Sequence, residues 1–204
     1  MTINKDYPST NYWEGNNPRS FMLHTTGGHG LIGAIETLIA RGLSYNYIIY
    51  QGVVYELVPY DKSAWHAGVI KNPNLRSKAF YGSLKGSENP NRQSVGVAFV
   101  YPDAPQDITV LPDADVSACI KLMKHVGSET NVRYNADNIF YHQEVTSDKP
   151  IMVKGYREQV LEALVGDKDG KDAGEKARLQ LMITYLTMKI KYLLLLKGLR
   201  DKNL

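Results

Sequence analysis

The chain has 204 residues, which suits one globular domain with an appendage and is too short for two full domains. Hydrophobic residues make up 43% and charged residues 22%, so the composition excludes disordered, collagen-like and disulfide-rich proteins. A net charge of +3 is too small to indicate a nucleic-acid partner, and the single Cys119 cannot form an internal disulfide.

The first 20 residues contain no apolar run of the length that a signal peptide needs. Their Asn, Pro and Gly content is typical of an arm that follows the protein surface. We therefore expect synthesis in the cytoplasm. A substrate outside the membrane would have to be reached by some route other than a signal on this chain.

The apolar pattern begins with a short buried strand, residues 21–23, which runs into His24. Apolar residues then recur at helical spacing over residues 31–39 and predict a helix. Residues 45–50 and 53–58 are rich in strand formers and flank a Gln-Gly pair, which predicts a hairpin.

The second half of the predicted domain alternates further strands and helices with one long loop. The remaining expected elements are a surface loop at 69–93, a strand at 95–101, a helix from 112 to 126, a strand at 139–141 that ends at His142, and a helix at 156–165. Strands mixed with covering helices in this order predict an α/β domain with a central mixed sheet flanked by helices.

The composition changes after residue 165. Residues 166–175 have the polar, Gly-containing composition of a linker, and residues 176–204 predict an added C-terminal helix that is apolar and basic. Lys189 and Lys191 interrupt its apolar stretch, which argues against a membrane-spanning helix. Such a helix suits either an anionic membrane surface or pairing with a second copy, and the sequence leaves both open. The predicted organisation is therefore a domain at 1–165, a linker at 166–175 and a helix at 176–204.

Two of the five histidines, His24 and His142, stand at the ends of predicted strands next to small or polar residues. Strand ends are where a rigid sheet presents side chains to an open site. A hydrolytic zinc site takes three protein ligands and leaves a position for water, and two histidines with one carboxylate are a standard set. Asp148 is the candidate third ligand, and Glu144 is its rival. Cys119 is a poor candidate because it lies on the apolar face of a predicted helix.

Five segments occur in a characteristic order: FMLHTTGG, SYNYIIYQGVVYELV, AWHAG, SVGVAFV and YHQEVTSDKP. Together they resemble the zinc-dependent N-acetylmuramoyl-L-alanine amidase family, which includes phage endolysins and peptidoglycan recognition proteins. The resemblance covers roughly residues 19–165 and does not extend to the linker or the C-terminal helix. It implies a mixed sheet with helices packed on it.

The resemblance also implies roles for individual residues. His24, His142 and Asp148 would be the zinc ligands, although the loop that leads to Asp148 is shorter than is usual in the family. Tyr45 falls on the catalytic tyrosine, and Thr146 on a second active-site donor.

Three further residues would belong to the substrate site. His66 matches a histidine of the substrate groove, with Trp65 beside it as a packing or sugar-contact residue. Lys149 is adjacent to the ligand segment and is a candidate for the same groove. Bacterial relatives often carry a glutamate base on the strand at 94–99, where this chain has Ala98, so we expect no such base here.

The implied activity is hydrolysis of the amide bond between N-acetylmuramic acid and the L-alanine of peptidoglycan. Lack of a signal and the basic tail helix favour a phage endolysin that waits in the host cytoplasm, passes the membrane and then attacks the bacterial cell wall. Two alternatives stay open, a non-catalytic peptidoglycan-binding module of the same fold and a membrane-surface adaptor led by the tail helix. No nucleic-acid partner is expected.

Overall fold

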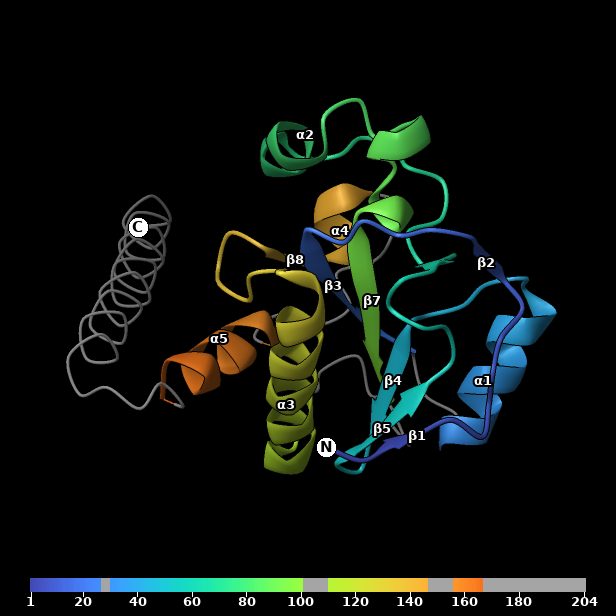
Figure 1. Cartoon of the computed structure of the whole chain (residues 1–204), viewed down its shortest axis with the longest axis vertical. Coiled ribbons are helices and arrows are strands. Elements are labelled where there is room, and N and C mark those ends of the chain that lie inside the picture. Colours follow the sequence, from blue (N-terminus) through green and yellow to red (C-terminus); the bar gives the residue numbers. More distant parts are fainter. Residues whose placement is uncertain (27–29, 101–109, 147–155, 167–204) are drawn as a thin grey trace, which may run out of the picture. The chain divides into compact units, whose positions relative to one another are not determined.

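The structure is a computed structural model that describes residues 1–26, 30–100, 110–146 and 156–166 (Figure 1). The chain divides into two compact units, residues 1–161 and 162–204. Residues 167–175 of the predicted linker and the whole predicted helix at 176–204 lie outside the described residues. Among the residues that the structure does describe, no helix has the length and apolar character needed to cross a membrane.

A mixed sheet forms the centre of the first unit. Its six described strands lie in the order β1 (Ile3–Asn4), β5 (Val53–Glu56), β4 (Tyr47–Tyr50), β7 (Ser94–Phe99), β3 (Ser20–Thr25) and β8 (Ile139–Tyr141). β3 pairs in parallel with both β7 and β8, and β7 pairs in parallel with β4, whereas β4 and β5 are antiparallel. The central mixed sheet predicted from the sequence is therefore confirmed.

Helices cover both faces of this sheet, as Figure 1 shows for α1 and α3. The described helices are α1 (Gly30–Ala40), α2 (Leu75–Tyr81), α3 (Asp113–Thr130), α4 (His142–Val145) and α5 (Tyr156–Gly166). From α1, Ile35 and Leu38 pack with Ile48 of β4 and Ala98 of β7 in one buried cluster. α3 lies against β4 and β5. This flanked sheet is the fold class that the sequence predicts.

The predicted hairpin is present and closes with a tight turn between β4 and β5. Gln51 and Gly52 both have positive φ angles, 51° and 76°, as a two-residue type I′ turn requires. The buried carboxylate of Asp115 in α3 accepts a hydrogen bond of 2.5 Å from the Gly52 N–H. This hydrogen bond links the turn to α3, the helix that packs on β4 and β5.

The prediction of a surface loop at 69–93 is wrong. The segment contains α2 and two short 3₁₀ helices, Gly86–Glu88 and Pro90–Arg92. Asn74 caps α2 by accepting a hydrogen bond from the Ser77 N–H at 2.8 Å. Tyr81 and Leu84 are buried in a cluster with Met22 of β3 and Phe140 of β8. The segment has too few apolar residues for a periodic pattern, so the sequence did not predict the helix. The apolar residues that it does have are buried in the core.

The N-terminal arm contains two short strands that the sequence analysis does not predict. Residues 3–4 add β1 to the edge of the sheet beside β5, and Tyr12–Trp13 form β2, which pairs with β6 (Ser63–Ala64). Two-residue strands carry too little pattern to be read from the sequence.

Candidate active site

Two adjacent parallel strands bring His24 and His142 together. His24 is the fifth residue of β3, and His142 directly follows β8. The register pairs Phe21 with Ile139 and Leu23 with Tyr141, so the carboxyl ends of the two strands meet. The two imidazole rings lie 4.6 Å apart, centroid to centroid. The sequence places both residues at strand ends, and the structure makes those ends neighbours.

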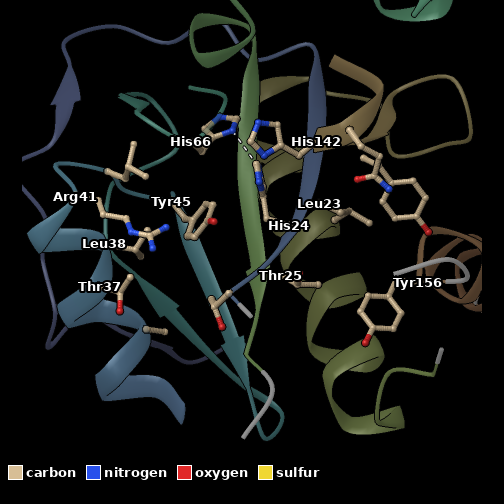
Figure 2. A pocket seen from close by; sticks show the side chains of 15 residues that line it. Leu23, His24, Thr25, Thr37, Leu38, Arg41, Tyr45, His66, His142 and Tyr156 are labelled. Atoms are coloured by element: carbon tan, nitrogen blue, oxygen red, sulfur yellow. Dashed lines mark hydrogen bonds between the residues drawn. The ribbon is translucent and has the colours of Figure 1, made fainter. Parts of the chain in front are cut away.

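A third histidine, His66, contacts His24 from the segment after β6. Its Nδ1 lies 3.1 Å from His24 Nε2. A dashed line marks this contact in Figure 2. The ring packs on β7 at Gly96, where a Cβ atom would stand only 2.6 Å from His66 Cγ. A glycine at this position of the strand is therefore what leaves room for the ring.

Hydrogen bonding fixes the tautomers of His66 and His24. The Ser94 hydroxyl donates its proton to the Pro90 carbonyl at 2.6 Å, so its oxygen accepts from His66 Nε2 at 3.3 Å. His66 Nδ1 is then an acceptor, and His24 Nε2 must be the donor across the 3.1 Å contact. This assignment leaves His24 Nδ1 as the ring atom with a lone pair.

The same reasoning applies to His142. Its Nε2 lies 2.8 Å from the Ala67 carbonyl oxygen, which can only accept a hydrogen bond. Nε2 is therefore the protonated atom, and Nδ1 carries the lone pair. A histidine that binds a metal commonly donates its other N–H to a carbonyl or a neighbouring side chain, and both His24 and His142 have such a partner.

Tyr45, just before β4, completes the cluster. Its ring centroid lies 4.8 Å from that of His24. Burial raises the pKa of the Tyr45 hydroxyl to about 12, so it keeps its proton at neutral pH. Burial, aided by the nearby His142, lowers the pKa of His66 to about 3, so this imidazole stays neutral.

These side chains line a cavity of about 150 Å³ that is also bounded by residues of α1 and of the segment after β3 (Figure 2). Sequence reasoning missed several polar residues of this lining, among them Arg41, Thr25 and Thr26. The threonine hydroxyls are buried and make no hydrogen bond within the described part of the chain. Thr25 and Thr26 directly follow His24 in the sequence, which was a signal for them, whereas no motif marks Arg41.

Other predicted site residues lie elsewhere or have different contacts. Trp65 packs against Trp13 in a tilted arrangement, with ring centroids 5.7 Å apart, and is not among the described residues that line the cavity. Thr146 is buried, and its hydroxyl accepts a hydrogen bond from the Lys71 N–H at 3.3 Å. Asp148 and Lys149 lie outside the described residues, so their predicted roles stay predictions.

Glu144, the rival third ligand, is engaged by other groups. One carboxylate oxygen pairs with Arg76 at 2.6 Å, and the other accepts from the Tyr141 N–H at 2.7 Å. Cys119 is fully buried, and burial raises the pKa of its thiol well above the ordinary value, which disfavours the thiolate that a metal needs. Neither residue has the surroundings of a zinc ligand.

The donor set fits part of a zinc site. In the described ranges, no group of three His, Cys, Asp or Glu side chains is arranged to hold a metal ion. The His24 and His142 rings nevertheless lie 4.6 Å apart and each has its Nε2 hydrogen-bonded, which is how two of three ligands would be prepared. Ala98 is the partner of His24 in the register with β7, so that point of the strand offers no carboxylate.

The fold and this cluster define an α/β protein with a histidine-lined site at the carboxyl ends of adjacent parallel strands. A model of the N-acetylmuramoyl-L-alanine amidase family matches residues 14–150, roughly two thirds of the sequence, and the chain belongs to this family. A search of curated proteins gives no match.

Solved structures share the fold. The N-acetylmuramoyl-L-alanine amidase LysC from Clostridium intestinale URNW is 17% identical and has a TM-score of 0.58; the match covers 80% of this chain and 97% of that one. The endolysin amidase LysCS from Clostridium intestinale URNW is 18% identical over 80% and 95% of the two chains, with a TM-score of 0.58. A selenomethionine derivative of AmpD is 19% identical over the same shares, with a TM-score of 0.57.

Proposed function

We propose that this protein is a peptidoglycan hydrolase that cleaves the amide bond between N-acetylmuramic acid and the L-alanine of the stem peptide. Membership of the amidase family supports peptidoglycan amidase activity. The observation that carries the proposal is the cluster of His24, His142 and Tyr45 around one cavity, because it combines two metal-type histidines with a neutral hydrogen-bond donor.

His24 and His142 would hold a zinc ion through their Nδ1 atoms, with Asp148 as the proposed third ligand. Bound zinc supplies Lewis-acid polarisation of the amide carbonyl and lowers the pKa of coordinated water to about 7. The protein's part would be to hold both imidazoles in a fixed orientation with one ring nitrogen hydrogen-bonded. The Ala67 carbonyl does this for His142, and His66 does it for His24.

Tyr45 is the proposed donor to the oxygen that gains negative charge when the amide is attacked. A phenol with a pKa of about 12 remains protonated at neutral pH and so can donate a hydrogen bond to that oxygen. His66 is a poor proton source because its imidazole is already neutral, with a pKa near 3. Its proposed role is therefore to orient His24, in addition to lining the groove as the sequence suggests.

Peptide stems carry carboxylates, and Arg41 is the cation on the cavity wall. Neither an ion pair nor a hydrogen bond engages its side chain within the described residues, and the hydroxyls of Thr25 and Thr26 lie in the same wall. We propose that these three side chains contact the stem peptide rather than the scissile bond.

The biological role that we propose is that of a phage endolysin, which acts on the bacterial cell wall after passing the membrane. One of the similar structures is described as an endolysin amidase, which supports this proposal. The proposed contact of residues 176–204 with an anionic membrane or with a second copy stays a prediction from the sequence.

Mass spectrometry of purified peptidoglycan, incubated with the protein with and without a zinc chelator, tests the activity. We expect stem peptides with a free L-alanine amine, and no release when the chelator is present. His24→Ala and His142→Ala should abolish release while the fold survives. Intact peptidoglycan after incubation with folded, zinc-supplied protein would refute the proposed amidase activity. It would favour the alternative, a non-catalytic peptidoglycan-binding module of the same fold.

A further inference from the structure

The helix that begins at His142 is too short to hold its own orientation. α4 comprises only four residues, His142–Val145, and one helical turn has almost no intrinsic stability. Its closing bond runs from the Thr146 N–H to the His142 carbonyl at 3.1 Å. Contacts from elsewhere must therefore fix the direction in which the His142 ring points.

The start of α2 supplies these contacts, and they converge on Glu144. The Asn74 N–H and the Ser77 hydroxyl donate to the Glu144 carbonyl at 3.1 and 2.6 Å. Arg76 donates from Nη1 to the Glu144 carboxylate at 2.6 Å. The other carboxylate oxygen accepts the Tyr141 N–H, which closes the first turn of α4 at its N-terminus. Glu144 is thus bound through both its backbone and its side chain.

Arg76 also fixes the chain just before His142. Its Nη2 donates to the carbonyls of Ala136 and Ile139 at 2.6 and 3.0 Å, and the guanidinium lies over the Phe140 ring, 4.0 Å from the centroid. One planar fork therefore joins α2, the strand β8 and α4. Lysine offers a point charge and cannot reproduce this set of directed bonds.

The same segment of chain reaches the His142 ring directly. The Ala67 carbonyl accepts the His142 Nε2 proton at 2.8 Å, and the chain runs on from Ala67 to α2, which begins at Leu75. Because His142 is the first residue of α4, a shift of α4 relative to Ala67 would strain the bond that holds the ring, in addition to moving its backbone.

We propose that Arg76 and Glu144 are a positioning pair that sets the orientation of His142 as a metal ligand. The inference rests on the proposed function, because it takes His142 to be a zinc ligand. The ion pair is half-buried, with exposed side-chain fractions of 31% for Arg76 and 18% for Glu144, so solvent screens it less than a surface pair.

Zinc affinity of the full chain, measured by competition with a chromophoric chelator, tests the pair. Arg76→Gln and Glu144→Gln should each weaken zinc binding about 10- to 100-fold, the usual effect of losing an outer-shell partner. The double variant should lose little more than either single one, because the two residues act as a unit. Arg76→Lys keeps the charge and loses the fork, so it should fall between wild type and Arg76→Gln.

The His142 ring provides a second readout that needs neither zinc nor hydrolysis. In ¹⁵N-labelled metal-free protein, the wild-type ring should show protonated Nε2 with slowed exchange. In both Gln variants this signal should broaden or move to a mixture of tautomers. Circular dichroism and thermal unfolding identify any variant that fails to fold, in which case Arg76→Lys decides.

Glu14→Gln is the matched control, since the Glu14 side chain is largely exposed and pairs with Lys62 at 3.2 Å, and no hydrogen bond or ion pair among the described residues joins it to α2 or α4. It should leave zinc affinity and the His142 signal at wild-type values. Folded Arg76 and Glu144 variants that keep both values within twofold of wild type would overturn the positioning pair. If wild-type protein hydrolyses no peptidoglycan while the variants still disturb His142, the proposed function fails and the positioning role stands.

Discussion

Gly96→Ala is the substitution with the most direct expected effect on the site. A Cβ at residue 96 would lie 2.6 Å from Cγ and 2.7 Å from Cδ2 of His66. Both atoms belong to a rigid ring that is only 5% exposed, so the ring must move or β7 must shift. Movement of the ring breaks its contact with His24 Nε2.

The cost has two parts. Overpacking a buried site by one methyl group costs about 1–3 kcal/mol. Loss of the His66 hydrogen bonds to His24 and Ser94 adds about 1 kcal/mol. We expect unfolding to become easier by about 2–4 kcal/mol, which lowers the melting temperature by roughly 5–15 °C for a chain of this size.

Thermal unfolding and zinc affinity of Gly96→Ala measure both consequences. Gly166→Ala is the control, because a Cβ at residue 166 meets nothing within 4 Å and the residue has no positive φ. Truncation of the ring should remove the clash, so Gly96→Ala should cost far less in a His66→Ala background. Wild-type stability and zinc affinity in Gly96→Ala would refute the claim that this glycine makes room for His66.

Three further predictions concern the cavity and the fold. Tyr45→Phe should lower kcat about 10²- to 10³-fold with peptidoglycan binding retained in a pull-down assay, and an unchanged kcat would remove Tyr45 from the chemistry. Arg41→Gln should raise KM about two- to fivefold for stems with free carboxylates and leave amidated stems unaffected; equal effects on both would exclude carboxylate recognition. Burial raises the pKa of Asp115 above its ordinary value of 3.8, although the hydrogen bond from Gly52 acts in the opposite direction. At neutral pH the charged carboxylate therefore lowers the free energy of unfolding. This loss of stability disappears as the pH falls through the raised pKa. The stability of Asp115→Asn relative to wild type, from urea unfolding, should therefore be highest at pH 7 and decrease towards pH 4, and a pH-independent difference would contradict this reasoning.

The sheet and the histidine pair were predictable because their signals are local. Strand formers around Gln51-Gly52 define a hairpin, and the two-residue turn with positive φ forms there. His24 and His142 each follow a short apolar run, and parallel pairing of those runs brings the rings together. The local pattern was enough to predict these two residues, because a residue at the end of a strand lies at the sheet edge whichever strand its own strand pairs with.

The surroundings of the histidines were not predictable, because they depend on contacts between distant segments. Nothing near His66 in the sequence reveals that its ring rests on Gly96 or that Ser94 fixes its tautomer. Glu144 resembles a ligand by position, yet Arg76 occupies its carboxylate from a segment that was predicted to be a loop. The sequence pattern therefore identifies the candidate site residues more readily than the residues that contact and orient them.

The order of the strands has a consequence for how the protein would acquire the proposed zinc ion. β3 comes near the start of the domain and β8 near its end, and the two meet only after the non-local parallel sheet has formed. While β8 has not yet been synthesised, the nascent chain contains His24 but lacks His142, so the histidine pair cannot form. If zinc binds as proposed, it would stabilise only the finished sheet, by about 2.7 kcal/mol at a free concentration 100 times Kd, and would not act on the early hairpin. Metal loading would then mark the end of folding rather than its beginning.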